Sequence, residues 1–286
     1  MTVGFSQVLA RVSRVAVKAP VTTSDLRIAS PSLAGRQRLL SLPCEPLLLA
    51  GWRDVVMLHF AVDADALQRE VPFAVERFEG QAFVSLVCFT LTGMRSRWGG
   101  GLGAVMLRPV GTHRYLNVRT YVRQGDESGI FFLAEWLSSR LATWLGPRLF
   151  RLPFRCGRLD YSNGDLVAGV RGCVQAVEGE LVYQGRPTAR DDTRPTGSAP
   201  GSLDEFLLER YTAFTVRSGR RGFFRVWHPA WVARRADCEV TERSLLTANW
   251  PWLGSAELVA AHHARGFDEV WMGWPHRLAA GADSTS

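Results

Sequence analysis

The chain of 286 residues is long enough for one large domain or two small ones, and its composition, 47% hydrophobic and 21% charged, excludes a disordered protein. No apolar run reaches the roughly 18 residues of a membrane-spanning helix, so the sequence predicts no transmembrane segment. The net charge of +7 is concentrated in residues 1–38, and the near balance of the remainder disfavours a nucleic-acid-binding protein.

Residues 1–40 are rich in Arg, Ser and Val and contain a single acid, Asp25. This composition resembles that of an organelle transit peptide, and it also fits a disordered extension or a start codon assigned too early in a bacterial gene. We therefore expect a basic, disordered leader at 1–40, a single β-rich domain at 41–278 and a disordered tail at 279–286.

The five cysteines are scattered and odd in number, with no C-x-x-C pair. This pattern disfavours a disulfide framework or a thiolate zinc site and fits a reducing compartment, so we expect a cytoplasmic protein. The glycine-rich stretch Gly99–Gly103 is expected to be a flexible loop that neither follows a convincing strand nor opens a helix. No cofactor and no metal are therefore expected.

Short runs of alternating apolar and polar residues fill the chain from Trp52 onward and predict strands. In chain order these are Val55–Val62, Ala82–Thr90, Tyr115–Arg123, Ile130–Trp136, Phe154–Tyr161, Asp165–Val174, Glu178–Tyr183, Phe223–His228 and Glu269–Trp274. Helices are expected after the cap Asp63, from Ser138 to Leu145 with an end near Gly146-Pro147, from the cap Ser202 to about Tyr211, and over 255–265. Ser162-Asn163-Gly164 predicts a tight hairpin turn, and Gln184–Gly201 a loop. Many strands with few helices between them predict an α+β protein with a predominantly antiparallel sandwich or barrel.

The strand Tyr115–Arg123 carries the most informative pattern. Side chains alternate along a strand, so one face carries Tyr115, Asn117, Arg119, Tyr121 and Arg123. Arginine offers a planar fork to a carboxylate, and asparagine and tyrosine supply further polar atoms. Asn117, Arg119 and Tyr121 are therefore candidate substrate-binding residues, and the alternative is an ordinary solvated face.

Three titratable residues are candidates for acid–base catalysis. His59 shares a strand face with Val55, Met57 and Ala61, which also fits a hydrogen-bonded core histidine. Glu135 is expected to alternate with Phe131 and Leu133, either as an acid or base with a raised pKa or as the ion-pair partner of Arg119. His228 ends a strand before Pro229, where it could sit at a pocket mouth or cap the chain locally.

The pair His262-His263 falls in the helix expected over 255–265 and is predicted to lie on its surface. No carboxylate or histidine follows at helical spacing, so this pair is not expected to bind a metal.

Several segments in fixed order resemble one protein family. They are Gly51–Phe60, Val62–Pro72, Phe83–Val87, Asn117–Val122, Leu152–Phe154, Gly201–Tyr211 and His228-Pro229. Together they are similar to the YqjF-like family of uncharacterised proteins, domain of unknown function 2071, over residues 50 to 275. That family is grouped with the acetoacetate-decarboxylase-like fold. The resemblance implies a curved antiparallel sheet that closes toward a barrel around a small-molecule pocket, with a few peripheral helices.

The resemblance also excludes one chemistry. Acetoacetate decarboxylase uses a buried lysine whose amine attacks a ketone to form a Schiff base. Lys18 is the only lysine of this chain and lies in the leader, outside the similar region. Arginine stays protonated and cannot form an imine, so Schiff-base decarboxylation is not expected.

These observations lead to three functional hypotheses. The first is a protein that binds a small organic acid or carbonyl compound, with Asn117, Arg119 and Tyr121 as ligand contacts. It could also act as a lysine-independent lyase, isomerase or hydrolase through Glu135, His59 or His228. The second is a non-catalytic binding or sensing module in which Arg119 and Glu135 form a satisfied pair. The third is a peripheral partner of membranes or nucleic acid through the leader and Arg140, Arg148 and Arg151. A homo-oligomer is compatible with each.

Overall fold

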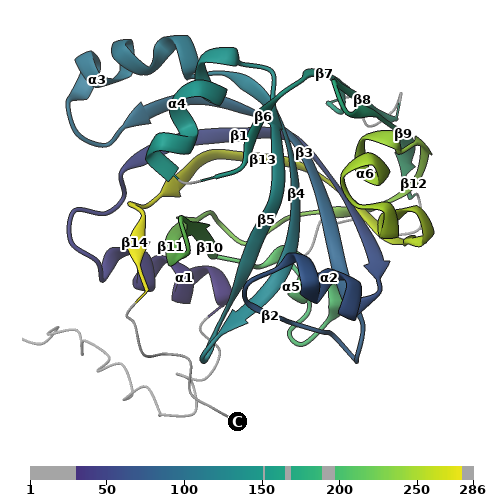
Figure 1. Ribbon diagram of the computed structural model, residues 1–286. Coiled ribbons are helices and arrows are strands. Elements are labelled where there is room, and N and C mark those ends of the chain that lie inside the picture. The colour runs from purple at the N-terminus through teal and green to yellow at the C-terminus, as the bar shows by residue number, and fades with distance from the viewer. Residues whose placement is uncertain (1–29, 151, 165–168, 189–196, 279–286) are drawn as a thin grey trace, which may run out of the picture.

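The computed structural model describes residues 30–150, 152–164, 169–188 and 197–278 (Figure 1). Its strands are β1 (Leu48–Val62), β2 (Ala74–Val75), β3 (Ala82–Ser96), β4 (His113–Gln124), β5 (Glu127–Leu137), β6 (Phe154–Cys156), β7 (Arg158–Ser162), β8 (Val170–Ala176), β9 (Gly179–Pro187), β10 (Thr212–Arg217), β11 (Arg220–Trp227), β12 (Arg234–Glu242), β13 (Glu257–Met272) and β14 (His276–Arg277). The helices are α1 (Pro31–Leu40), α2 (Ala64–Glu70), α3 (Gly100–Leu107), α4 (Arg140–Phe150), α5 (Leu203–Leu208) and α6 (Ser244–Asn249), with short 3₁₀ turns η2 (Arg108–Val110) and η3 (Pro251–Ser255).

The sheet curls into a ring. Hydrogen-bonded neighbours follow in the order β11, β10, β5, β4, β3, β1 and β13, and β13 pairs back with β11 through Val226–Met272 and Trp227–Trp271 (Figure 1). These pairings are antiparallel apart from β5 with β10. The expected fold class, an α+β protein dominated by a curved antiparallel sheet, is thus confirmed.

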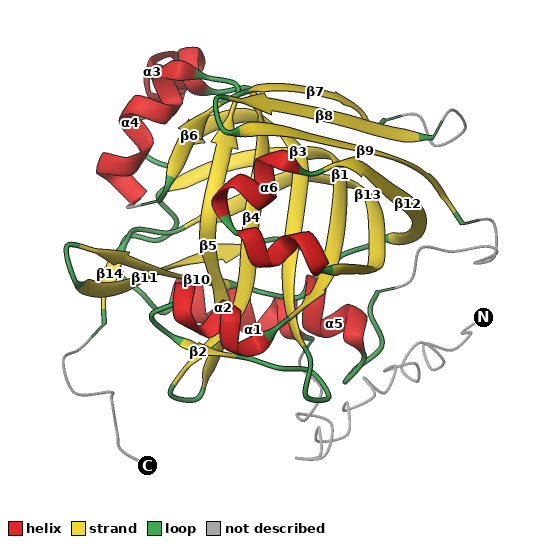
Figure 2. Ribbon diagram, turned by 45° about the vertical axis from the view of Figure 1, so that its right-hand side comes forward, coloured by secondary structure: helices red, strands yellow, loops and turns green. Residues whose placement is uncertain are grey.

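A second group of strands covers part of the outside of the ring. β12 pairs with β13 at Arg234 and Arg235 and then runs alongside β9, which continues through β8 to β7 (Figure 2). Helix α6 packs against β9 within this layer. The ring therefore has an outer face covered by protein and an inner face that encloses its own interior.

Alternation along the ring strands produces two apolar cores. On β1, Val56, Leu58 and Phe60 point outward and join a core shared with β8, β9 and α6. Val55 and Met57 point inward and join a core with residues of β3, β4, β5 and α5. The inner core fills one end of the ring and leaves the other end open for a cavity.

The helices begin where their capping residues predict. The Asp63 carboxylate accepts a hydrogen bond from the backbone N–H of Ala66 at 2.6 Å, and the Ser202 hydroxyl accepts one from Glu205 at 3.2 Å. Both caps were expected from the sequence. Helix α5, which Ser202 caps, is shorter than expected, because it ends at Leu208 and Thr212 already begins β10.

Helix α1 shows that the packed chain begins inside the segment expected to be a disordered leader. The Ser32 hydroxyl donates to the carbonyl oxygen of His228 at 2.7 Å. Gly35 lies so close to the ring of Tyr211 that a Cβ atom there would be 2.5 Å from it, so only glycine allows this approach. Residues 1–29 and the expected tail at 279–286 lie outside the described residues.

The helix expected over 255–265 is wrong, because Glu257–Met272 is the longest strand of the sheet. Its alanine-rich sequence favours a helix locally, but β13 has partners on both sides. It pairs with β1 along most of its length, and on its other edge with β12 at His262 and His263 and with β11 at its C-terminal end. His262 and His263 are consequently buried within the sheet and do not lie on a helix surface.

Two further boundaries differ from expectation. The stretch Gly99–Gly103 was expected to be a loop, but Gly100 opens helix α3. Helix α4 does not stop near Gly146-Pro147 and continues to Phe150. The hairpin predicted around Asn163-Gly164 is formed by β7 and β8, and its last pair is Ser162 with Arg171, so the turn is longer than two residues.

Candidate functional site

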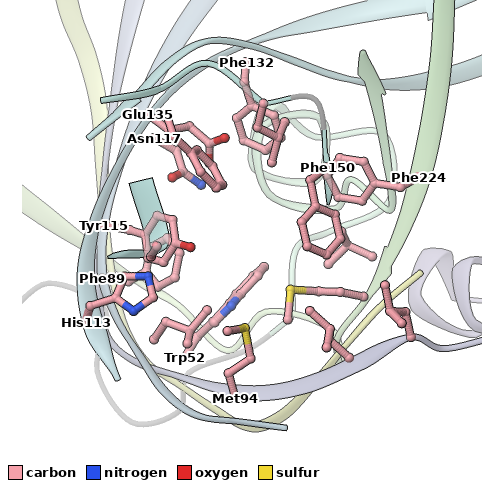
Figure 3. A pocket seen from close by; sticks show the side chains of 18 of the residues that line it. Trp52, Phe89, Met94, His113, Tyr115, Asn117, Phe132, Glu135, Phe150 and Phe224 are labelled. Atoms are coloured by element: carbon pink, nitrogen blue, oxygen red, sulfur yellow. The ribbon is translucent and has the colours of Figure 1, made fainter. Parts of the chain in front are cut away.

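A cavity of about 260 Å³ occupies the open end of the ring (Figure 3). Its walls come from β1, β3, β4, β5, β11 and the helices α3 and α4, and most of its lining is apolar. The aromatic part of the lining comprises Trp52, Phe89, Tyr115, Phe132, Phe150, Phe154, Phe224 and Trp274. Such a concave, largely apolar site with a few polar groups is the usual form of a small-molecule pocket.

The polar groups gather on neighbouring strands at one side of this cavity. Asn117 on β4 is paired directly with Glu135 on β5, and their side chains lie next to each other across the cavity from Phe150 and Phe224 (Figure 3). Arg119, two residues further along β4, also lines the cavity. The strand face predicted from the sequence as a ligand wall therefore faces a cavity, and the solvated alternative does not hold for these residues.

A β-bulge decides which way Glu135 points. The pairing of β4 with β5 shifts between Val118–Ala134 and Arg119–Phe132, so Leu133 has no partner on β4. Glu135 therefore shares the inner face with Phe132, and the expected alternation with Phe131 and Leu133 is wrong.

Burial disfavours the charged form of Glu135 and raises its pKa well above the ordinary 4.5. The side chain is 3% exposed, and its Oε2 has no hydrogen-bond partner among the described residues. The carboxyl group is thus held in an environment that favours the protonated acid, which can donate a hydrogen bond as well as accept one.

Arg119 is a buried cation. Its Nη2 donates to the backbone carbonyl of Leu207 at 3.2 Å, and its Nε has no partner. No carboxylate of the described residues forms a salt bridge with it, so the ion pair with Glu135 that the sequence left open is not present. A buried guanidinium without a counter-ion is costly unless a ligand neutralises it.

Two more polar residues of the wall have few hydrogen-bond partners. Asn117 Oδ1 has no hydrogen bond within the described part of the chain, and the His113 ring has no partner there other than the backbone of Val110. Burial lowers the pKa of His113 to about 4, so its ring is neutral near pH 7. His113 was not singled out from the sequence, although it continues the inward series of Tyr115, Asn117 and Arg119 two residues earlier.

His228 also lines the cavity, directly after the end of β11. Its Nδ1 lies 2.7 Å from the carbonyl oxygen of Pro229, the local contact that the sequence allowed. The ring packs among Trp52, Tyr211 and Trp231, and burial lowers its pKa to about 4. His228 is therefore a neutral part of an aromatic wall.

His59 and Tyr121 do not line the cavity, but are linked behind it. Tyr121 donates its hydroxyl proton to the carbonyl of Leu207 at 2.9 Å, so it accepts from the Ser85 hydroxyl at 2.6 Å. Ser85 in turn accepts from His59 Nδ1 at 2.7 Å, because its own proton is committed. Burial lowers the pKa of His59 well below 6.5, which agrees with a neutral ring whose Nε2 is an acceptor.

This series of polar contacts continues to Asp204 in the first turn of α5. His59 Nε2 accepts from His262 Nδ1 at 3.1 Å, and His262 Nε2 lies 3.2 Å from the Asp204 carboxylate. Asp204 also pairs with Arg235 at 2.6 Å. Neither the contact of His59 with His262, 203 residues apart, nor the place of Ser85 between two strands could be read from the sequence. We call this series from Asp204 to Tyr121 the α5 network.

No group of three or more metal-ligating side chains is found among the described residues. No helix in that part of the chain is long and apolar enough to cross a bilayer.

Residues 49–268 match the sequence model of the DUF2071 family, described as an uncharacterized conserved protein. The chain belongs to this family. It is similar to the uncharacterized protein YqjF of Bacillus subtilis, with 28% identity over 229 residues that cover 79% of this chain and 90% of YqjF. The family resemblance that the sequence segments indicated is confirmed.

Solved structures with the same fold are acetoacetate-decarboxylase-like proteins. The enduracididine biosynthesis enzyme MppR, solved in complex with pyruvate, has a TM-score of 0.60 and 14% identity, covering 83% of this chain and 92% of MppR. An acetoacetate-decarboxylase-like enzyme from Sphingomonas wittichii RW1 has a TM-score of 0.56 and 14% identity, covering 82% of this chain and 94% of that enzyme. Acetoacetate decarboxylase from Legionella pneumophila has a TM-score of 0.57 and 11% identity, covering 85% of this chain and 94% of the decarboxylase. At identities this low, the structural similarity shows the fold of this chain alone.

Proposed function

We propose that this DUF2071 protein binds a small organic acid or carbonyl compound in the cavity of the ring. The observation that carries the proposal is Arg119, a buried cation that lines the cavity without a carboxylate partner among the described residues. A ligand carboxylate would supply the missing negative charge and engage the guanidinium in charge-assisted hydrogen bonds.

The polar atoms beside Arg119 fit the rest of such a ligand. Protonated Glu135 can donate a hydrogen bond to a carbonyl oxygen, while Asn117 can donate or accept. The apolar remainder of the cavity would enclose the carbon skeleton. MppR, which has the same fold, has been solved with pyruvate, a compound that joins a carboxylate to a ketone.

If the bound compound reacts, Glu135 is the residue we assign to proton transfer. A carboxyl group with a raised pKa can act as a general acid near neutral pH. Lys18, the only lysine, lies outside the described residues and outside the family match, so a Schiff base is not part of this proposal. His228 would contribute to the aromatic lining of the cavity. His59 does not line the cavity and would act only through the α5 network. A non-catalytic binding or sensing module remains the alternative, with the same ligand contacts.

Titration calorimetry with pyruvate and with its uncharged methyl ester tests the assignment. We expect the wild-type protein to prefer the acid, and Arg119→Met to weaken pyruvate binding by about 10- to 100-fold, the effect of losing a hydrogen bond to a charged group. Arg140→Met, which removes an exposed arginine outside the cavity, is the matched control. Equal binding of pyruvate by wild-type protein and Arg119→Met would show that Arg119 is not the anion contact.

A further inference from the structure

Helices α3 and α4 form a cap beside the cavity whose outer side is unusually apolar. The two helices lie next to each other in both views of the ribbon (Figures 1 and 2), with η2 connecting α3 to β4. One side of the cap lines the cavity through Leu107, Val110, Ala142 and Phe150. We call the α3–η2–α4 unit the helical cap.

Large apolar side chains of the helical cap, and Trp98 shortly before α3, are exposed to solvent. The exposed fractions are 54% for Trp98, 65% for Val105, 73% for Met106, 44% for Leu141 and 59% for Trp144. Helix α3, with the sequence GGLGAVML, has no polar side chain at all. A helix that is apolar all round is normally buried, whereas Val105 and Met106 of α3 are exposed to solvent.

The charged side chains of the two segments that contain the helical cap are all basic. No Asp or Glu occurs between residues 80 and 125 or between residues 136 and 159, the two segments that contain the helical cap. Arg97, Arg108 and Arg140 are exposed there, and none of them forms a salt bridge with a described residue. The Arg97 guanidinium lies 5.2 Å from the centre of the Trp98 ring.

We propose that the helical cap docks onto the surface of a membrane that contains anionic lipids. Exposed tryptophan and aliphatic side chains can enter the boundary between headgroups and acyl chains, while arginines beside them bind lipid phosphates. The absence of acids over both segments fits an anionic surface in particular.

A second copy of the chain fits the same surface less well. In a symmetric dimer the same patch meets itself, so Arg97, Arg108 and Arg140 would approach their own counterparts. Without acids in either segment, this arrangement would bring like charges together, and an anionic membrane would instead neutralise them.

Sedimentation of the full-length protein with lipid vesicles tests the proposal. Vesicles of phosphatidylcholine alone are compared with vesicles in which about one third of the lipid is phosphatidylglycerol, at roughly physiological ionic strength. We expect binding to the anionic vesicles, and the double variant Val105→Glu/Met106→Glu should reduce the partition coefficient at least tenfold. Val177→Glu/Val232→Glu places the same two charges on exposed valines outside the helical cap and should leave partitioning within about twofold.

Three results would overturn membrane docking. The first is no vesicle binding by the wild type. The second is binding that survives in Val105→Glu/Met106→Glu, which would assign it to charge elsewhere, such as the basic leader. The third is light scattering that shows a wild-type dimer and a monomeric double variant without vesicle binding, which would assign the cap to a second copy. Pyruvate titration of the double variant is unaffected by these outcomes, because neither residue lines the cavity, so the two proposals fail independently.

Discussion

Two buried polar regions of the ring differ in how their hydrogen bonds are satisfied. The α5 network joins Tyr121, Ser85, His59 and His262 in series, and each link is a contact of 2.6 to 3.1 Å. Near it, Arg210 pairs with Glu76 at 2.7 Å. The wall formed by β4 and β5 has the opposite character, because several of its buried polar atoms have no partner among the described residues.

Under the proposed function, the difference separates polar groups that stabilise the fold from polar groups that a ligand would satisfy. Buried polar groups in folded proteins are nearly always hydrogen-bonded, since leaving one unmet costs about 1–3 kcal/mol. In the α5 network only His262 Nε2 lacks a hydrogen bond within the described residues, and it lies 3.2 Å from the Asp204 carboxylate, so the network as a whole contributes to stability and to a unique arrangement of its strands. Unpaired groups that converge on a cavity cost stability, and a bound ligand is the natural explanation for their presence.

The contrast between two arginines should give the largest effect. Arg210 and Arg119 both line the cavity and both are buried, but only Arg210 has a counter-ion, Glu76. Glu76→Gln should destabilise the protein by about 3–5 kcal/mol, because it leaves a buried guanidinium unpaired. Urea unfolding measures this loss. The double variant Glu76→Gln/Arg210→Met should recover part of it, and a loss no larger than that of an exposed glutamate such as Glu257→Gln would contradict the assigned pairing.

The next effect concerns the α5 network. Ser85→Ala removes the hydroxyl between His59 and Tyr121 and leaves an unpaired donor on the imidazole and a tyrosine oxygen without its donor. We expect a loss of about 2–3 kcal/mol in the free energy of unfolding. Ser255→Ala, which removes an exposed hydroxyl, is the control. Ligand binding should change little, since Ser85 does not line the cavity; a large loss of pyruvate affinity at unchanged stability would place the network in the site itself.

The wall and the network were accessible to sequence reasoning to different degrees. The inward series of Asn117 and Arg119 follows from strand alternation, which is a local property. The orientation of Glu135 does not, because one unpaired residue, Leu133, shifts the alternation and nothing in the local sequence marks the bulge. The structural contact of His59 with His262 depends on the pairing of β1 with β13.

Strand β13 shows why the sequence prediction failed at its most important point. Ala260, Ala261 and Ala264 favour a helix, and the two histidines then appear to be surface residues. Pairing on both edges overrides this preference, and alanine is small enough to lie flat between packed neighbours. The resemblance to the family supplied the fold correctly where local propensity did not.

The pH dependence of stability gives a smaller effect that is specific to the wall. Because the folded state holds the pKa of Glu135 above 4.5, it retains a proton that the unfolded chain has released. Stability therefore falls as the pH rises from about 4.5 toward the folded pKa, by at most about 1.4 kcal/mol per pH unit for this group. Glu135→Gln removes this titration, so the stability of the variant relative to the wild type should rise as the pH rises over that range. A difference that stays constant between acidic and neutral pH would mean that Glu135 is ionised in the folded protein.

The smallest effect on stability is expected at the residue that matters most for binding. Arg119→Met replaces an unpaired buried cation by an apolar side chain of similar length, and it removes only the hydrogen bond to Leu207. The gain from avoided desolvation offsets that loss, so the free energy of unfolding without ligand should stay within about 1 kcal/mol of the wild-type value or rise. Thermal unfolding in the presence of pyruvate then separates the two roles, because the same pyruvate concentration should stabilise the wild type more than the variant. If Arg119→Met instead destabilises the free protein as strongly as Glu76→Gln, Arg119 belongs with the paired, structural arginines, and the wall loses its claim to an anionic ligand.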